Sequence, residues 1–327
     1  STRRWSRSCE KLAPDLANEI FVAPMEADDW GRLRFFAADR DRYVPFGFTY
    51  RWISRLLLLY ERKPVRRWRN RALDFVYDQV RQEDENTGFL GVGPVSKIYN
   101  LLVRFDREPD GAAMEKHWES LTTYLCVDDE GTSVNGYNHS RLWDTAFAVQ
   151  ALARATPMLS ESGEANTAIH RGIGYIHQQQ LHEDPPRPDD YFRDGSIGGW
   201  PFSDHIHGWP ISDCTAEGLK ACLAASSLGA PTLPHDRIEA AVDRILAWQN
   251  PDGGWPTYER RRASPLLERL NPSLTFADIM VDHSHVECTS ACLQALRQVA
   301  PLLDARRIEK IDRASSPGLR FLEKYQR

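Results

Sequence analysis

An internal repeat constrains the fold of this 327-residue chain more than any other feature of the sequence. Three segments align without a gap on Thr145, Thr215 and Thr289, and they read DTAFAVQALARA, CTAEGLKACLAA and CTSACLQALRQV. Successive threonines lie 70 and 74 residues apart. Each segment has apolar residues at helical spacing and small residues that allow close helix packing. The pattern predicts a series of similar helices that lie side by side.

A second series of amphipathic stretches runs between these segments and ends in glutamine, at Gln180, Gln249 and Gln326. NPDGGW follows Gln249 and closes on Trp255, and a longer polar insertion after Gln180 ends in GGW at Trp200. Two helices per unit are typical of folds whose units bury apolar faces only against their neighbours. We therefore predict an all-α fold, an α/α toroid in which inner helices alternate with outer helices.

The sequence changes character near residue 128. Before this point, residues 51–62 and 94–105 have helical periodicity outside the register of the repeat. The stretch 128–140 is polar and contains glycine, as domain boundaries often do. We expect two domains, 1–128 and 129–327.

The repeat reaches the end of the chain before its pattern is complete. Only one residue follows Gln326, where a turn and an aromatic residue are expected, and the chain does not begin with methionine. Since toroid units stabilise one another, half a toroid is a poor independent fold. We expect a central fragment of a longer protein that is inactive alone.

Charge and cysteine content disfavour several classes of protein. Lys and Arg number 41 against 46 Asp and Glu, a net charge of −5, so we expect no nucleic-acid partner. Six cysteines without CxxC spacing argue against a disulfide scaffold and favour a reducing compartment. We find no apolar stretch of about 18 residues and no signal peptide in STRRWSRSCEK. The oligomeric state leaves no mark in the sequence.

Asp213 and Cys214 stand at the start of the second repeated segment, and Cys288 takes the place of Cys214 in the third. The simplest role for Ser212 or Asp213 is that of a helix N-cap. Two features favour a chemical role for Asp213. The preceding segment is unusually aromatic, and both cysteines belong to the same end of the toroid. Both interpretations stay open at this level.

Two His-x-His pairs have a spacing that metal ligands use, but no carboxylate or cysteine motif at a diagnostic distance supports them. We therefore predict no metal and no other cofactor. The pairs are His205 with His207 and His283 with His285.

Aromatic residues gather at the ends of the repeat units, where a toroid opens its cavity. Each of them alone is most simply a core residue. Together with a single acid they suit cationic chemistry on a hydrocarbon, because ring faces stabilise cations without acting as bases. The set comprises Trp143, Trp200, Phe202, Trp209, Trp255, Tyr258 and Phe276.

Residues 62–71, RKPVRRWRNR, form a strongly basic run. Such a run is usually a solvated helix face. Next to RWISRLLLLY it also suits contact with lipid head groups, with the apolar side chains dipped into the bilayer surface.

The chain as a whole resembles the oxidosqualene cyclases of sterol and triterpene biosynthesis. SDCTAE resembles their catalytic signature, and QNPDGGWPTYE resembles their repeated Gln-to-Trp motif. LWDTAFAVQAL, QEDENTGFLGVGPVSK and LLERLNPSLTFADIMVDHSHVECTSACLQAL resemble further family segments, in the family's order, over approximately residues 45–327. The resemblance implies a two-barrel α/α fold, with 1–128 in the inserted second barrel and 129–327 in the first half of the catalytic barrel. It also implies a monotopic protein on the cytosolic face of a membrane, in a eukaryote the endoplasmic reticulum or lipid droplet.

The resemblance further implies cyclisation of 2,3-oxidosqualene without a cofactor. Asp213 would match the acid that protonates the epoxide, because burial keeps such a carboxyl protonated. Cys214 and Cys288 would match the thiols that hydrogen-bond this acid, and Glu217 the residue that helps to return its proton. The aromatic wall of the cavity would be matched by Trp143, Phe202, Tyr258 and Phe276.

Three cavity positions bear on the product. Tyr137, His207 and Ile211 match the Tyr, His and Ile that distinguish the cycloartenol-forming members, and EDENT at 83–87 also resembles that branch. We expect His207 to accept the last proton with Tyr137 orienting it, and Ile211 to restrict movement of the intermediate. The sequence departs from the family at His139, where glycine is usual.

Other readings remain. Lanosterol or another triterpene is the first alternative product. A protein prenyltransferase β-subunit would need a zinc set of Asp, Cys and His, and DCTAE lacks the required histidine spacing. In a non-catalytic helical scaffold, Asp213 would only cap a helix. Cyclases of unoxidised squalene use an acidic cluster richer in Asp.

Overall fold

The computed structural model describes residues 39–158 and 163–325, which belong to two compact units. The described part of the small unit consists of residues 39–64 and Pro265–Met280. The described part of the large unit consists of residues 65–158, 163–264 and 281–325. Gln326 and the N-terminal residues considered for a signal peptide lie outside the described residues.

The small unit is built on helix α4 (Phe48–Arg62), which packs on the short 3-10 helix η7 (Pro265–Leu270). The backbone N–H of Val44 donates to the carbonyl of Leu274 at 2.8 Å and ties the two segments of this unit together. The helix predicted from the periodicity of residues 51–62 is therefore present. Its N-cap is Gly47.

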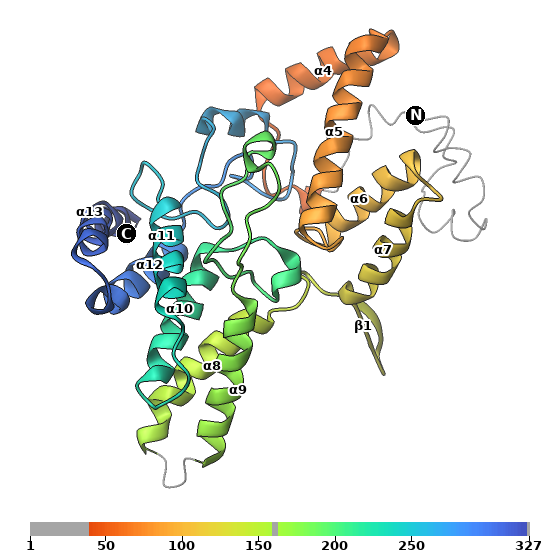
Figure 1. The fold of residues 1–327 in the computed structure, drawn as a ribbon. Helices are drawn as coiled ribbons and strands as arrows, with labels where there is room; N and C mark the ends of the chain where they lie inside the picture. The colour runs from red at the N-terminus through yellow and green to blue at the C-terminus, as the bar shows by residue number, and fades with distance from the viewer. Residues whose placement is uncertain (1–38, 159–162, 326–327) are drawn as a thin grey trace. The chain divides into compact units, whose positions relative to one another are not determined.

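The regular secondary structure of the large unit is helical apart from one β-hairpin, with long loops between some of the helices (Figure 1). Three helices precede the repeat: α5 (Arg66–Asn86), α6 (Pro94–Arg107) and α7 (Ala112–Leu121). Pro94 is the first residue of α6, where its missing N–H is harmless. The repeat itself forms α8 (Arg141–Ala155), α9 (Gly163–Gln179), α10 (Ser212–Ser226), α11 (His235–Ala247), α12 (Val286–Val299) and α13 (Ala305–Tyr325). Short 3-10 helices lie at Thr122–Tyr124, Thr156–Met158, Pro188–Tyr191, His205–His207 and Ala300–Leu302.

The three aligned threonines lie at corresponding places in α8, α10 and α12. Helix α10 packs against both α8 and α12, while α9, α11 and α13 pack on the outside of this row. The predicted all-α fold with alternating inner and outer helices is therefore confirmed. Eleven of the 15 residues of α10 are buried, because this helix has neighbours on both sides.

The polar stretch 128–140 contains the end of one strand and all of another, which the sequence did not lead us to expect. Strands β1 (Leu125–Asp128) and β2 (Gly131–Val134) form an antiparallel hairpin. Asp128 stabilises the turn, since its Oδ1 accepts from the backbone N–H groups of Glu130 and Gly131. The expected domain boundary at residue 128 lies within this hairpin, away from the division between the two compact units, and stays a prediction.

A turn before α10 is fixed by Trp200 and Gln180. The indole N–H of Trp200 donates to the carbonyl of Ile176 at 2.7 Å, and its backbone N–H donates to Thr215 Oγ1 at 2.9 Å. The amide of Gln180 donates to the carbonyl of Gly198 at 2.9 Å. The turn therefore joins the end of α9 to the first turns of α10.

The turn before α12 repeats these bonds with Trp255 and Gln249. The Trp255 indole donates to Ile245 O at 2.7 Å, and its backbone N–H to Thr289 Oγ1 at 2.9 Å. The Gln249 amide donates to Gly253 O at 2.8 Å. Gly253 has a φ of +91°, and a Cβ there would lie 2.5 Å from a carbonyl oxygen of α13, so only glycine fits.

Candidate active site

The carboxyl group of Asp213 lies between the first turns of α10 and α12. Helix α10 begins at Ser212 with Ile211 as its N-cap, so the N-cap role considered for Ser212 or Asp213 is wrong. Asp213 Oδ1 instead accepts from the Cys214 backbone N–H at 2.7 Å. Asp213 Oδ2 lies 3.7 Å from the thiol of Cys288, which donates to it. The paired cysteines thus meet at one carboxyl group.

Burial raises the pKa of Asp213, and this effect exceeds the lowering by hydrogen bonds from Cys214 and Cys288. The negative charge of Glu217 raises the pKa further. Burial also raises the pKa of both thiols, that of Cys288 to about 12, so they remain neutral donors. The arrangement favours a protonated carboxyl group and also provides donors for the anion that remains after proton loss.

Glu217, one turn further along α10, is buried in a polar row that crosses three helices. Its carboxylate binds Lys220 Nζ at 2.7 Å and accepts from the Gln150 amide at 2.8 Å. Lys220 in turn donates to Gln294 Oε1 at 3.3 Å. Sequence reasoning missed Gln150, Lys220 and Gln294. A signal was present, because each of them follows the aligned threonine of its own helix by the same five residues.

Tyr137 is the centre of an aromatic cluster. Its ring packs edge-on against Phe202 with centroids 4.9 Å apart, and Phe202 lies 5.9 Å from Trp143. Its hydroxyl group lies 3.4 Å from the Tyr258 hydroxyl. The charge of Asp213, when ionised, raises the pKa of Tyr258, which links this cluster electrostatically to the acid. The structure thus brings three predicted wall residues, Trp143, Phe202 and Tyr258, together with Tyr137.

His207 is fully buried, and its Nε2 lies 3.2 Å from the carbonyl oxygen of Gly91. Burial lowers its pKa to about 4, so the ring is neutral at pH 7. Its ring centroid lies 5.6 Å from that of Tyr137. The hydrogen-bonding partner of Tyr137 is Tyr258, and that of His207 is Gly91, so the expected orientation of His207 by the Tyr137 hydroxyl differs from the observed geometry.

Ile211 is buried in the core directly before α10, and its backbone N–H donates to the carbonyl of Trp200. Phe276 belongs to the small unit, where it is 64 % exposed. Its predicted place in the cavity wall stays a prediction. His205 binds Gln179 through its ring nitrogen, separately from His207.

Two further polar residues hold the aromatic loops and were missed in the sequence. The Arg193 guanidinium lies 3.7 Å from the ring centroid of Trp209 and binds Glu259 at 2.7 Å, although Arg193 is only 4 % exposed. Asp282 accepts from the backbone N–H groups of residues 257–259 and fixes the position of Tyr258. Neither residue has a periodic neighbour or a motif that would have indicated it.

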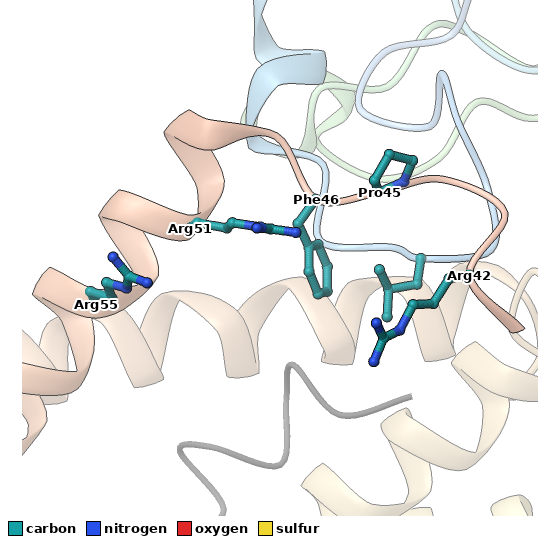
Figure 2. A pocket seen from close by; sticks show the side chains of 6 residues that line it. Arg42, Pro45, Phe46, Arg51 and Arg55 are labelled. Carbon is teal, nitrogen blue, oxygen red and sulfur yellow. The ribbon is translucent and has the colours of Figure 1, made fainter. Parts of the chain in front are cut away.

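A separate cavity of about 410 Å³ lies in the small unit and is rich in arginine. Figure 2 shows Arg51 and Arg55 projecting from consecutive turns of α4, with Arg42 in the segment before this helix. Arg42 also pairs with Asp39 at 3.2 Å. The cavity has a positive lining that suits an anion, completed by Pro45, Phe46 and Leu274.

Within residues 39–158 and 163–325, no helix combines the length and apolar character needed to cross a bilayer.

Comparison with known proteins identifies the family. Residues 139–327 match the squalene-hopene cyclase C-terminal domain. The chain is 39 % identical over 323 residues to cycloartenol synthase of Dictyostelium discoideum, which covers 97 % of this chain and 45 % of the relative. It is 35 % identical over 328 residues to lanosterol synthase of Homo sapiens, which covers 99 % and 44 %. The chain thus spans less than half the length of these relatives. Because the matched domain covers more than half of the chain, the chain belongs to the oxidosqualene cyclase family.

Proposed function

We propose that this chain forms part of an enzyme that cyclises (3S)-2,3-oxidosqualene to a sterol precursor. The observation that carries the proposal is the partly buried Asp213 carboxyl group, held between the Cys214 backbone N–H and the Cys288 thiol. An acid that protonates an epoxide at neutral pH must hold its proton before the reaction, and the anion that it leaves must be stabilised afterwards. Burial serves the first need and the two donors serve the second.

Asp213 donates its proton to the epoxide oxygen, the C–O bond opens, and the cation passes along the folded hydrocarbon. Glu217 helps to return a proton to Asp213, in keeping with the effect of its charge on the pKa of that carboxyl group. Lys220 and Gln150 hold the Glu217 carboxylate for this role. No metal or cofactor is needed for these steps.

The aromatic cluster supplies the surroundings of the cation. The faces of Trp143, Phe202 and Tyr258 offer negative electrostatic potential without a lone pair basic enough to end the cascade early. Such rings take over from water, which would add to the cation. Phe276 is proposed as a further wall residue on the resemblance alone.

Cycloartenol is the product that we propose. A cyclopropane ring requires loss of a proton from a methyl group beside the final cation, which needs a base near that methyl group. His207 is neutral at pH 7 because its pKa is about 4, so it has a free lone pair. Ile211, larger than valine by one methylene, limits movement of the intermediate. The 39 % identity to a cycloartenol synthase agrees with this product.

Lanosterol is the second candidate product. Human lanosterol synthase is 35 % identical to the chain, nearly as much as the Dictyostelium cycloartenol synthase. The two products arise from the same cascade and differ in its last steps, the final position of the cation and the proton that is then lost. The residues around His207 therefore decide between them.

We also propose that the protein lies on a membrane surface. Helix α4 exposes Trp52, Leu56 and Leu59 together with Arg51 and Arg55. A helix with both apolar and basic exposed residues binds the interface of anionic bilayers. Co-sedimentation with vesicles that contain anionic lipid tests this, and equal recovery without vesicles would contradict it.

An exchange protein tests the catalytic proposal. This chain replaces the matching segment of the Dictyostelium cycloartenol synthase, and the product is identified in a host that lacks its own cyclase. We expect cycloartenol, and we expect lanosterol-type products beside it after Ile211→Val or Tyr137→Thr. A folded exchange protein that makes no cyclised product would refute the function, and lanosterol as the main product would refute the product assignment. The unexchanged synthase is the control.

A further inference from the structure

A buried polar network links α5, α6 and α7, away from Asp213. Asp84 is completely buried, and its Oδ2 accepts from Arg104 Nε at 2.8 Å and lies 3.2 Å from His117 Nε2. Its Oδ1 accepts from the Asn100 amide at 3.2 Å. A buried charge with this many partners is rigid, because any displacement leaves a polar atom unsatisfied.

Lys97 extends the network to a neighbouring turn. Only 1 % of Lys97 is exposed, and its ammonium group has one acceptor for each of its N–H bonds. The acceptors are the Phe89 carbonyl at 2.6 Å, Ser120 Oγ at 2.5 Å and His117 Nδ1 at 2.9 Å. Since an ammonium group only donates, His117 Nδ1 must be unprotonated. His117 therefore donates through Nε2 to Asp84.

The turn that Lys97 holds contains three successive carbonyl groups that all accept hydrogen bonds. Lys97 binds the carbonyl of Phe89, and the Tyr124 hydroxyl donates to that of Leu90 at 3.0 Å. The Ser120 hydroxyl also donates to that of Phe89 at 2.9 Å, and the Tyr124 hydroxyl lies 3.4 Å from that of Gly91. The carbonyl of Gly91 lies 3.2 Å from His207 Nε2. Phe89 has a φ of +63°, which a non-glycine residue adopts only when its surroundings impose it.

The Gly91 carbonyl determines the tautomer of His207. A carbonyl oxygen only accepts, so His207 Nε2 carries the hydrogen that Gly91 accepts. Nδ1, a buried atom without a hydrogen-bond partner among the described residues, has the lone pair of the neutral ring. The Trp209 backbone also acts on the ring and raises its pKa. The backbone directly after His207 also has little free space. A Cβ on Gly208 would lie 2.2 Å from the carbonyl oxygen of Asn86.

We infer that Lys97 is a positioning residue for His207: through the Phe89–Gly91 turn, it holds the carbonyl that makes Nδ1 the proton-accepting nitrogen. This inference rests on the proposed function, in which His207 accepts the last proton. Nδ1 is then the nitrogen of His207 that accepts the proton, and the buried network around Lys97 is the structure that selects this tautomer. Lys97 itself touches neither His207 nor the proposed substrate.

The first test follows the tautomer in the full chain and needs no activity. The chain is labelled with 15N-histidine, and His207→Gln identifies the ring signals of His207. We expect a single Nε2–H tautomer in the unsubstituted chain. Lys97→Met keeps the buried stem but loses all three bonds, and it should produce a mixture of tautomers. Met114→Ala, which also disturbs buried packing in α7 but removes no bond to the turn, is the matched control and should change nothing.

Tyr124→Phe keeps the test decisive if Lys97→Met does not fold. It removes only the hydroxyl group that donates to the Leu90 carbonyl at 3.0 Å and also lies 3.4 Å from the Gly91 carbonyl, and it should shift the tautomer ratio about fivefold, the effect of one ordinary hydrogen bond. In the exchange protein, the same variants should raise the share of lanosterol-type products. An unchanged tautomer in both folded variants would overturn the inference. A changed tautomer with no cyclised product from any exchange protein would overturn the proposed function instead.

Discussion

The buried ring of His207 predicts a pH-dependent stability that a single substitution removes. His207→Gln keeps a side-chain N–H for the Gly91 carbonyl but takes away the titrating group. The charged groups that act on His207 are Asp204, which raises its pKa, and Arg193, which lowers it. Burial outweighs both and sets the direction.

The size of the effect follows from the two pKa values. The pKa of the His207 ring falls from 6.5 in the unfolded chain to about 4 in the folded chain. At about 1.4 kcal/mol for each pH unit, complete protonation costs the folded state about 3 kcal/mol. Because the folded pKa is depressed, this stability is present above pH 6.5 and is lost as the pH falls through about 4. Between pH 7 and pH 5 the loss is about 2 kcal/mol.

Urea unfolding of both chains at pH 7, 6 and 5, followed by tryptophan fluorescence, measures the difference. The unsubstituted chain should lose about 2 kcal/mol more than His207→Gln over this range. Other histidines with a lowered pKa, such as the half-buried His177, titrate alike in both chains and cancel. A difference between the two chains that stays constant with pH would refute the assignment of a depressed pKa to His207.

Three further outcomes follow from the same geometry. Because the pKa of Asp213 is raised, its contribution to stability is present below about pH 3.8 and is lost as the pH rises through the pKa of the folded chain. In urea unfolding, Asp213→Asn should therefore be more stable than the unsubstituted chain at pH 8 but not at pH 3. Gly208→Ala should lower the free energy of unfolding by about 2 kcal/mol or more, because φ is +61° and the added Cβ meets Asn86; an unchanged urea midpoint would contradict this. Trp255→Phe should lower it by about 1 to 2 kcal/mol, because the indole bond to the Ile245 carbonyl is lost while the Trp248 N–H still donates to that carbonyl; a loss below about 0.5 kcal/mol would show that the indole bond is unimportant.

The repeat predicted the part of the fold that is local and periodic. Helices α8, α10 and α12 lie where the segments aligned on Thr145, Thr215 and Thr289 predicted them. Asp213 and Cys288 also come together, because Cys288 stands at the place in its unit that corresponds to Cys214, the residue next to Asp213. Local sequence is sufficient for such features, since each repeat specifies its own helix and the stacking brings equal positions together.

Features that depend on contacts between distant segments could not be predicted in this way. Asp84, Lys97 and His117 form one network, yet they lie on three helices and share no period. Tyr137 and Tyr258 meet across 121 residues of chain. From the sequence we pair the Tyr137 hydroxyl with His207, because a linear sequence does not show which of the two rings lies nearer. The position of Phe276 could not be predicted either, because Phe276 belongs to the small unit.

The central claim is that Asp213 is the acid that starts the cyclisation. The most direct measurement is the rate of cyclised triterpene formation from 2,3-oxidosqualene by the exchange protein with and without Asp213→Asn, with far-ultraviolet circular dichroism as the control for folding. The amide cannot donate the required proton, so we predict no detectable product from a folded variant, and a smaller loss for Cys288→Ala, which removes one weak hydrogen bond. A folded Asp213→Asn protein that retains activity within about tenfold of the unsubstituted exchange protein, less than about 1.4 kcal/mol in the barrier, would contradict the account.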